Sequence, residues 1–203
     1  MGRTSRTAAP LASSVILDGM EPAIAEASHP ERRALVRRAT LEDSRHAASI
    51  SEAIRAEVEA GSIGMALRSA KLIVERMRAG DAIIAVAGAE WAGFCYLSPW
   101  EGGAFVSTSA LIVPLRSRGL GLARRLKEEA LRLGSEQYPQ ARPFGLSTSP
   151  AVIGINRSLG LREVSYRELP RDPAFWKGCE TCPLHATLVV RRGDSCHCTA
   201  MVR

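Results

Sequence analysis

Residues 111–123 read LIVPLRSRGLGLA, and this stretch decides the fold class. It begins with the apolar end of a strand expected over residues 104–113 and continues into a turn that contains Gly119 and Gly121. A helix is expected next, because apolar residues recur at steps of three and four. These residues are Ala123, Leu126, Ala130 and Leu133. The stretch therefore predicts a strand, a glycine turn and an amphipathic helix in direct succession.

The glycine turn has the features of an anion site. Without side chains at Gly119 and Gly121, successive N–H groups can point outward together beside the positive end of the helix dipole. The dinucleotide fingerprint does not fit, because Arg124 stands three residues after Gly121, and no Gly-Lys-Ser/Thr follows for a Walker A loop. The turn predicts a pyrophosphate cradle, flanked by Arg116 and Arg118. The alternative is a tight connection that uses glycine for packing alone.

The remaining pattern predicts an α/β (α+β) domain. Thr40 and Asp43 have the spacing of a capping box at the start of a helix. The expected order is strand, two helices, three antiparallel strands, helix, strand, helix, strand. The expected strands cover residues 34–39, 81–87, 91–98, 104–113, 144–149 and 161–169, and the second and fourth helices cover 65–79 and 150–158.

Three features in this order resemble the GNAT superfamily of acetyl-CoA-dependent N-acyltransferases. Residues 116–121 (Arg-x-x-Gly-x-Gly) satisfy the family signature Gln/Arg-x-x-Gly-x-Gly/Ala, and residues 36–43 are similar to the family's first strand and helix start. Residues 159–161 (Leu-Gly-Leu) stand where the family has Leu-Gly-Phe. The resemblance covers residues 34–170. It implies a mixed, mostly antiparallel sheet of six to seven strands flanked by about four helices.

The resemblance also implies acetyl-CoA, or another acyl-CoA, as co-substrate. The family's fourth and fifth strands splay apart, so the backbone of Leu111, Ile112 and Val113 would pair with the pantetheine arm as if it were another strand. The residues implied for the pyrophosphate are Arg116, Ser117, Arg118, Gly119, Leu120, Gly121 and Leu122.

Two catalytic positions follow from the resemblance and from the chemistry. Many family members carry a Tyr as general acid where this chain has Asn156. The Asn156 amide cannot give up a proton at neutral pH, but its N–H groups can hydrogen-bond the thiolate or the cofactor. Tyr166, Ser158 or water are the alternative acids. For the base that deprotonates the acceptor ammonium, we expect Glu101 first and Glu90 second. The alternative for both glutamates is a solvated turn residue.

The chain is expected to divide into three parts. Residues 1–32 predict a flexible tail, residues 33–170 the acyltransferase domain, and residues 171–203 an extra C-terminal hairpin packed on the same domain. The hairpin carries four cysteines as Cys-x-x-Cys and Cys-x-Cys: Cys179, Cys182, Cys196 and Cys198. Four converging thiolates predict a possible zinc site. The alternative is that reduced cysteines pack as small hydrophobic side chains.

Composition excludes several kinds of partner. The net charge is +6, but arginine supplies 24 of the 27 basic residues throughout the chain, and aromatics are only 5%, too few for a base-stacking surface. We expect no nucleic acid and, without an apolar run of 18 residues, no membrane. An odd count of five cysteines and the lack of a signal-peptide pattern favour a reducing cytoplasm over a disulfide framework. A homodimer is an open alternative for the assembly.

The acceptor is expected to be a small-molecule amine. Residues 149–156 together with residues 175–179 (Phe-Trp-Lys-Gly-Cys) are similar to a bacterial GNAT subgroup that acylates amino acids in arginine synthesis. That similarity implies glutamate or a related amino acid, clamped by arginines such as Arg157 or Arg162, for which surface solvation is the alternative. Two other functions stay open. One is a protein or peptide N-acetyltransferase, and the other is a non-catalytic acyl-CoA-binding or zinc-dependent interaction module.

Overall fold

A computed structural model describes residues 34–61, 65–182 and 197–203. Within these residues, seven strands form one mixed sheet in the order β1-β2-β3-β4-β5-β7-β6, in which only β4 and β5 are parallel. The strands are β1 Leu35–Arg38, β2 Ala82–Ala87, β3 Glu90–Trp100, β4 Phe105–Ile112, β5 Arg142–Ser147, β6 Arg162–Glu163 and β7 Thr199–Val202. The helices are α1 Ala47–Glu59, α2 Ala70–Ala79, α3 Leu122–Gln137, α4 Pro150–Ser158 and α5 Pro173–Lys177. The predicted mixed, mostly antiparallel sheet is confirmed.

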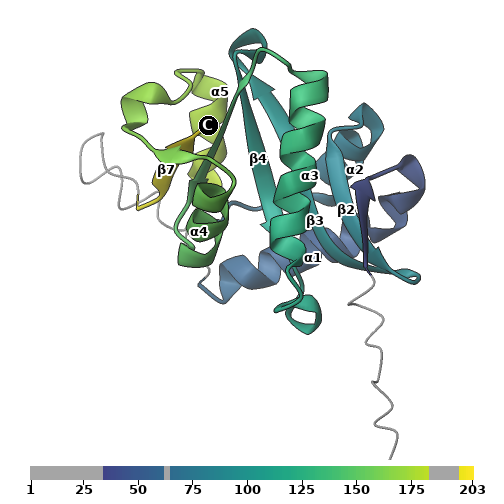
Figure 1. The fold of residues 1–203 in the computed structure, drawn as a ribbon. Helices are drawn as coiled ribbons and strands as arrows, with labels where there is room; N and C mark the ends of the chain where they lie inside the picture. The colour runs from purple at the N-terminus through teal and green to yellow at the C-terminus, as the bar shows by residue number, and fades with distance from the viewer. Residues whose placement is uncertain (1–33, 62–64, 183–196) are drawn as a thin grey trace, which may run out of the picture.

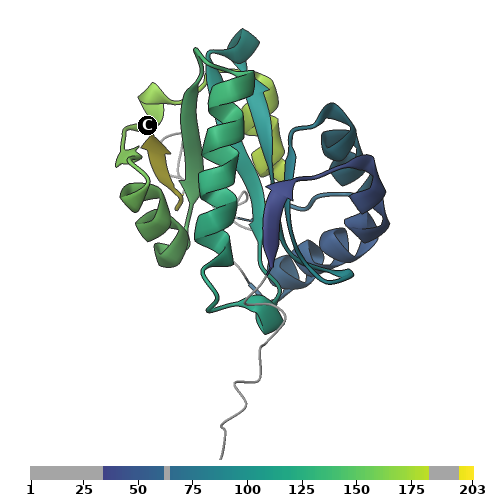
Figure 2. The same cartoon turned by 45° about the vertical axis from the view of Figure 1, so that its right-hand side comes forward.

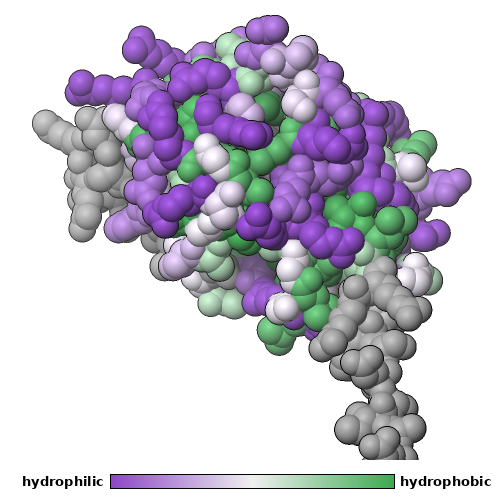
Figure 3. Space-filling model, in the orientation of Figure 1, coloured by the Kyte–Doolittle hydropathy of each residue, from purple (hydrophilic) through white to green (hydrophobic). Residues whose placement is uncertain are grey.

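Helices cover both faces of this sheet. On one face, Ile50 and Ile54 of α1 and Ile73 of α2 pack on alternate residues of β2 and β3. On the other face, Leu126 and its apolar neighbours on α3 pack on the intervening residues, such as Cys95. Figure 1 shows α3 across the near face, and Figure 2 shows α1 and α2 grouped beside β1, apart from α3. The solvent-facing side of α3 is mainly hydrophilic (Figure 3).

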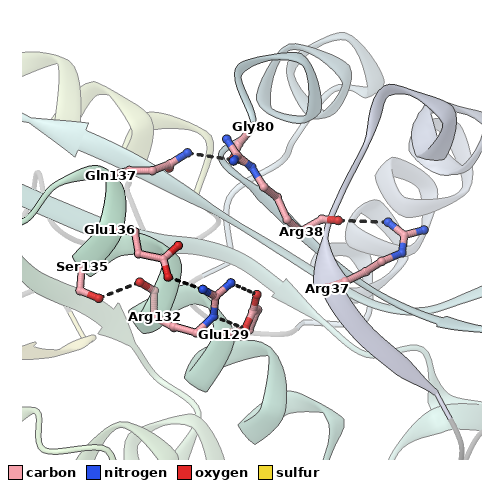
Figure 4. Close-up of polar contacts among 8 residues, drawn as sticks. All are labelled: Arg37, Arg38, Gly80, Glu129, Arg132, Ser135, Glu136 and Gln137. Carbon is pink, nitrogen blue, oxygen red and sulfur yellow. Dashed lines mark hydrogen bonds and ion pairs between the residues drawn. The ribbon is translucent and has the colours of Figure 1, made fainter.

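Hydrogen bonds link β1 to the helices on both faces of the sheet. The predicted capping box forms, with the Asp43 carboxylate accepting from the Thr40 N–H at 2.8 Å. Gly80 ends α2 in the left-handed conformation, with φ of 73°. Its carbonyl accepts from Arg38 Nε at 2.7 Å and from Gln137 Nε2 at 3.3 Å, so β1 and the end of α3 meet at the end of α2 (Figure 4).

The sheet opens between β4 and β5. Residues 105–107 pair with residues 142–144, and no pair between the described parts of the two strands continues beyond Ser107 and Phe144. Figure 1 shows the strands meeting near the top of the view and separating below. On its other edge β4 carries a bulge, where the register with β3 shifts and Ala110 takes a positive φ of 53°. A bulge re-aims neighbouring groups, here along the opening.

Three elements differ from the sequence prediction. Helix α2 begins at Ala70, because Ser69 caps it by accepting from the Leu72 N–H. Of the strand expected over residues 161–169, only Arg162–Glu163 forms. The final strand belongs to the sheet itself, since β7 lies between β5 and β6. The other half of the expected hairpin falls in residues 183–196, outside the described residues, as does the tail. Within the described ranges, no helix has the length and apolar character needed to cross a bilayer.

Candidate active site

A cavity of about 1280 Å³ runs through the opening in the sheet. Its wall takes Arg68 and Leu72 from the α2 side and Ala123 from the α3 side, with Asn156 contributed by α4. Residues of the unpaired part of β4, including Leu111, lie along it. The two faces of the sheet therefore share one cavity, with an α3 end and an α2 end.

The α3 end has the features of an anion site. Gly121 is the N-cap of α3 and offers no side chain to cap the first N–H groups of the helix. A Cβ at Gly119 or Gly121 would meet no described atom within 4 Å, so the space in front of the turn is open. Ser117 lies on the same wall, and its hydroxyl is fully buried without a partner among the described residues. A buried hydroxyl of this kind requires a ligand or water to complete its hydrogen bonding.

Eight of the ten predicted cofactor residues line the cavity, and Arg116 and Leu120 do not. Arg116 donates to the Trp91 carbonyl at 2.8 Å, and its guanidinium lies 5.8 Å from the centre of the Trp91 ring. Arg118 does line the cavity, donates to the Val113 carbonyl at 3.0 Å and forms an ion pair with Glu57.

The signature therefore fits the structure better two residues later. Residues 118–123 also read Arg-x-x-Gly-x-Ala, and this register makes Gly121 the residue before α3 and brings its arginine to the cavity. Both registers satisfy the same pattern, so the sequence alone does not choose between them.

Asn156 lies where β4 and β5 separate. It is 1% exposed, lines the cavity, and its Oδ1 has no partner within the described chain. Its Nδ2 sits 3.7 Å from the position that a Cβ on Gly145 would take, so it packs over the β5 residue directly after the last β4–β5 pair. The amide is thus held at the vertex of the opening.

The predicted bases do not reach the cavity. Glu101 is exposed in the turn between β3 and β4, and its carboxylate accepts from the Arg171 N–H. Glu90 is exposed at the other end of β3. Of the described carboxylates, Glu57 alone lines the cavity, and it is paired with Arg118.

The alternative acids are also occupied elsewhere. The Tyr166 hydroxyl donates to the Cys198 carbonyl. Ser158 donates to the Ile155 carbonyl at 2.7 Å and accepts from Arg124 at 2.8 Å. Neither side chain is on the described cavity wall.

Two cationic residues on the wall were not predicted. Arg68 precedes α2 and donates from Nε to the Tyr96 hydroxyl at 2.6 Å. Lys127 on α3 is 3% exposed, and burial lowers the pKa of its ammonium to about 8. Neither residue has a carboxylate partner among the described residues. By contrast, Arg157 and Arg162, the predicted clamps, pair with surface glutamates.

The cysteines give no support to zinc. Cys179, Cys182 and Cys198 line the cavity, while Cys196 lies outside the described residues. Within the described residues, no group of three or more His, Cys, Asp or Glu could hold a metal ion.

The cavity fits an acyl-CoA. The open helix end, the orphaned Ser117 hydroxyl and Arg118 suit the pyrophosphate, and the unpaired edge of β4 suits the amide-bearing pantetheine arm. No family model and no curated protein matches the sequence. Solved structures do match.

N-acetylglutamate synthase from Neisseria gonorrhoeae, complexed with coenzyme A and N-acetyl-glutamate, matches with a TM-score of 0.59 and 19% identity. The match covers 84% of this chain but 34% of the synthase, so this chain spans about a third of its length. Rv2747 from Mycobacterium tuberculosis, in complex with CoA and NLQ, matches with a TM-score of 0.58 and 16% identity, over 83% of this chain and 97% of that one.

The GNAT superfamily phosphinothricin acetyltransferase from Sinorhizobium meliloti, in complex with AcCoA, matches with a TM-score of 0.53 and 20% identity. Here the match covers 64% of this chain and 76% of that chain. The structural likeness shows the fold, whereas sequence identities of 16–20% leave the substrate open. The split sheet, the glycine turn before α3 and these matches together show that the protein has the fold of the GNAT superfamily of acetyltransferases.

Proposed function

We propose that this protein is an N-acyltransferase that moves an acetyl group from acetyl-CoA to the amino group of a small acidic amino acid, with glutamate as first candidate. One observation carries the proposal. The cavity through the sheet has an open helix N-terminus at one end and, at the other, the guanidinium of Arg68 without a carboxylate partner among the described residues. The first feature suits acyl-CoA and the second suits an anionic acceptor.

Acyl-CoA would bind at the α3 end. The N–H groups from Ser117 to Leu122, with Arg118, would hold the pyrophosphate. The edge of β4 from Leu111 to Val113 would hydrogen-bond the pantetheine amides, because β5 has turned away there. A backbone N–H of the β4 bulge near Ala110 would polarise the thioester carbonyl.

The acceptor would enter from the α2 end. Arg68 presents a planar group of donors that matches a carboxylate, and the Tyr96 hydroxyl fixes its Nε. Arg76 also lines this end but is already paired with Asp81 at 3.4 Å. Arg68 is therefore the guanidinium available to an acidic side chain or an α-carboxylate.

The chemistry is a direct transfer in a ternary complex. The neutral amine attacks the thioester carbonyl, a C–N bond forms, the C–S bond breaks, and CoA thiol leaves. Holding both substrates in one cavity supplies the orientation that this bimolecular step needs.

A thiol-release assay tests the proposal. With acetyl-CoA as donor, glutamate should give turnover, while a neutral amino acid should react more slowly and an acetyl-accepting peptide should not react. Arg68→Ala should raise the KM for glutamate about 10- to 100-fold, since hydrogen bonds to charged groups contribute about 1.5–3 kcal/mol. The KM for acetyl-CoA should stay unchanged.

Arg78→Ala is the matched control, because Arg78 lies exposed on α2 away from the cavity wall. It should leave both KM values as they are. Turnover of the peptide but not of glutamate would show that the acceptor is a protein. Absence of turnover with every acceptor, together with tight CoA binding, would favour a binding module.

A further inference from the structure

Lys127 is a buried cation with no local reason to be charged. Its side chain is 3% exposed, yet it lines the cavity. No hydrogen bond or ion pair from its ammonium to a described residue exists. A buried ammonium without a partner is costly, so such a group is retained where a ligand completes its environment.

Lys127 lies on the side of α3 that faces α4. Arg124, three residues earlier and so on the same side of the helix, donates to Ser158 of α4 at 2.8 Å. Asn156 also projects from α4 and is buried at the vertex of the β4–β5 opening. Lys127 and Asn156 thus line the same cavity from two neighbouring helices.

The position of Lys127 separates it from the pyrophosphate end. It stands five residues after Leu122, so its Cα is about 7–8 Å further along the helix axis at 1.5 Å per residue. With the diphosphate of an acyl-CoA at the first turn of α3 and Arg118, Lys127 would face a part of the ligand that lies deeper in the cavity. In an acyl-CoA that part is the thioester end.

We propose that Lys127 is the general acid of the reaction and donates a proton from its ammonium to the CoA thiolate as that thiolate leaves. The inference rests on the proposed acyl transfer. It also explains how the reaction proceeds with an asparagine at position 156, because Asn156 can hydrogen-bond the sulfur while Lys127 supplies the proton. Burial that brings the ammonium pKa to about 8 matches it to a thiol, whose pKa is about 8.5.

After the amine has attacked, the C–S bond breaks and sulfur keeps its electron pair. An N–H bond of the Lys127 ammonium breaks and the proton goes to sulfur, which leaves CoA thiol and a neutral lysine. The proton lost from the attacking nitrogen goes to water, and Lys127 takes a proton back from water before the next turnover.

Single-turnover thiol release with acetyl-CoA and glutamate tests the role, since it excludes product release from the measured rate. Lys127→Met should slow the reaction about 100-fold or more while acetyl-CoA affinity changes little. Lys127→Arg keeps a positive charge but gives up no proton, so it should be similarly slow. Lys71→Met, on the exposed surface of α2, is the matched control and should react at the wild-type rate. A wild-type rate in Lys127→Met or Lys127→Arg would overturn the proposal.

The pH profile adds a readout that a purely structural role would not move. The wild-type rate should fall above about pH 8, where the ammonium is lost, and the Lys127→Arg rate should not. Cys95 of β3, on the face of the sheet that α3 covers, acts electrostatically on Lys127, and burial raises the pKa of the Cys95 thiol to about 12. The other ionisable groups on the described wall are Glu57, Arg68, Arg76, Tyr96, Arg118, Arg124, Cys179, Cys182 and Cys198. These groups are the same in the wild type and in Lys127→Arg, so the difference between the two pH–rate profiles reports Lys127.

A measurement without acceptor separates this inference from the proposed function. Ultraviolet titration of the CoA thiol in the binary complex should show a lower thiol pKa with wild-type protein than with Lys127→Met, because a nearby ammonium stabilises the thiolate. If that difference is present but no acceptor is turned over, the acyl-transfer proposal falls and the placement of Lys127 beside sulfur stands. If glutamate is acetylated but the two thiol titrations coincide, Lys127 is not the acid.

Discussion

Replacing Lys127 with methionine should stabilise the protein. Methionine has a similar length and no charge, so it fills the same space without the cost of burying an ammonium. Burial lowers the lysine pKa from 10.5 to about 8. A shift of this size corresponds to about 3 kcal/mol of folding free energy, at 1.36 kcal/mol for each pKa unit.

The sign and the pH window follow from linkage. The folded state holds the lysine proton less tightly than the unfolded state, so the penalty is complete below about pH 8 and disappears as pH rises from 8 to 10.5. At pH 7, Lys127→Met should therefore raise the free energy of unfolding by about 3 kcal/mol. For a domain of this size that gain raises Tm by roughly 6–12 °C.

Thermal and denaturant unfolding of the two proteins, measured without CoA from pH 7 to pH 10.5, provide the assay. The stability difference should be largest at pH 7 and should shrink steadily toward pH 10.5. Lys71→Met should show neither effect, because that lysine is exposed. A destabilised Lys127→Met, or a difference that does not change with pH, would refute the assignment of a buried, unpaired ammonium.

Two further predictions concern the Asp43 contacts beside β1 and the glycine turn before α3. Desolvation would raise the pKa of Asp43, but the hydrogen bonds it accepts from Arg37, at 2.7 and 2.9 Å, and from the Thr40 N–H outweigh it and lower the pKa to about 2. Its contribution to stability is complete above about pH 4 and is lost as pH falls toward 2, so Asp43→Asn should weaken that dependence in acid unfolding curves. Gly121→Val places a β-branched residue at a φ of 72°, so it should lower both Tm and the affinity for CoA in calorimetry. An unchanged affinity for CoA in Gly121→Val would show that the glycine turn does not bind CoA.

Patterns among neighbouring residues were sufficient to predict much of the fold from the sequence. The capping box at Thr40 and Asp43, and the glycine turn before α3, involve residues within a few positions of one another, so their chemistry is legible in the sequence. The position of β7 in the sheet could not be predicted from such local patterns. Its partners on β5 and β6 lie about 35 to 60 residues earlier in the chain, and pairing at that separation depends on the whole sheet.

The site was predicted in part for the same reason. The glycine turn was predicted from one continuous stretch, and the unpaired edge of β4 was implied by the resemblance to the GNAT superfamily. Arg68, by contrast, lies in a segment that was expected to be helical, and only the tertiary fold brings it to the cavity. Lys127 stands beside two glutamates on a helix rich in arginine, so its sequence context indicates a solvated face. The one available signal was its rarity as one of three lysines among 27 basic residues. Arginine cannot replace lysine where a proton must be given up.

Hydrogen–deuterium exchange with and without CoA tests the central claim most directly, because that claim concerns which backbone groups meet the co-substrate. Amides in residues 108–113 of β4 and residues 117–124 of the glycine turn should become protected when CoA binds, since they gain hydrogen bonds that β5 does not supply. Edge strand β1, Leu35–Arg38, should not change. Saturating CoA without protection in these two segments, or protection confined to other parts of the chain, would contradict an acyl-CoA site in the split between β4 and β5.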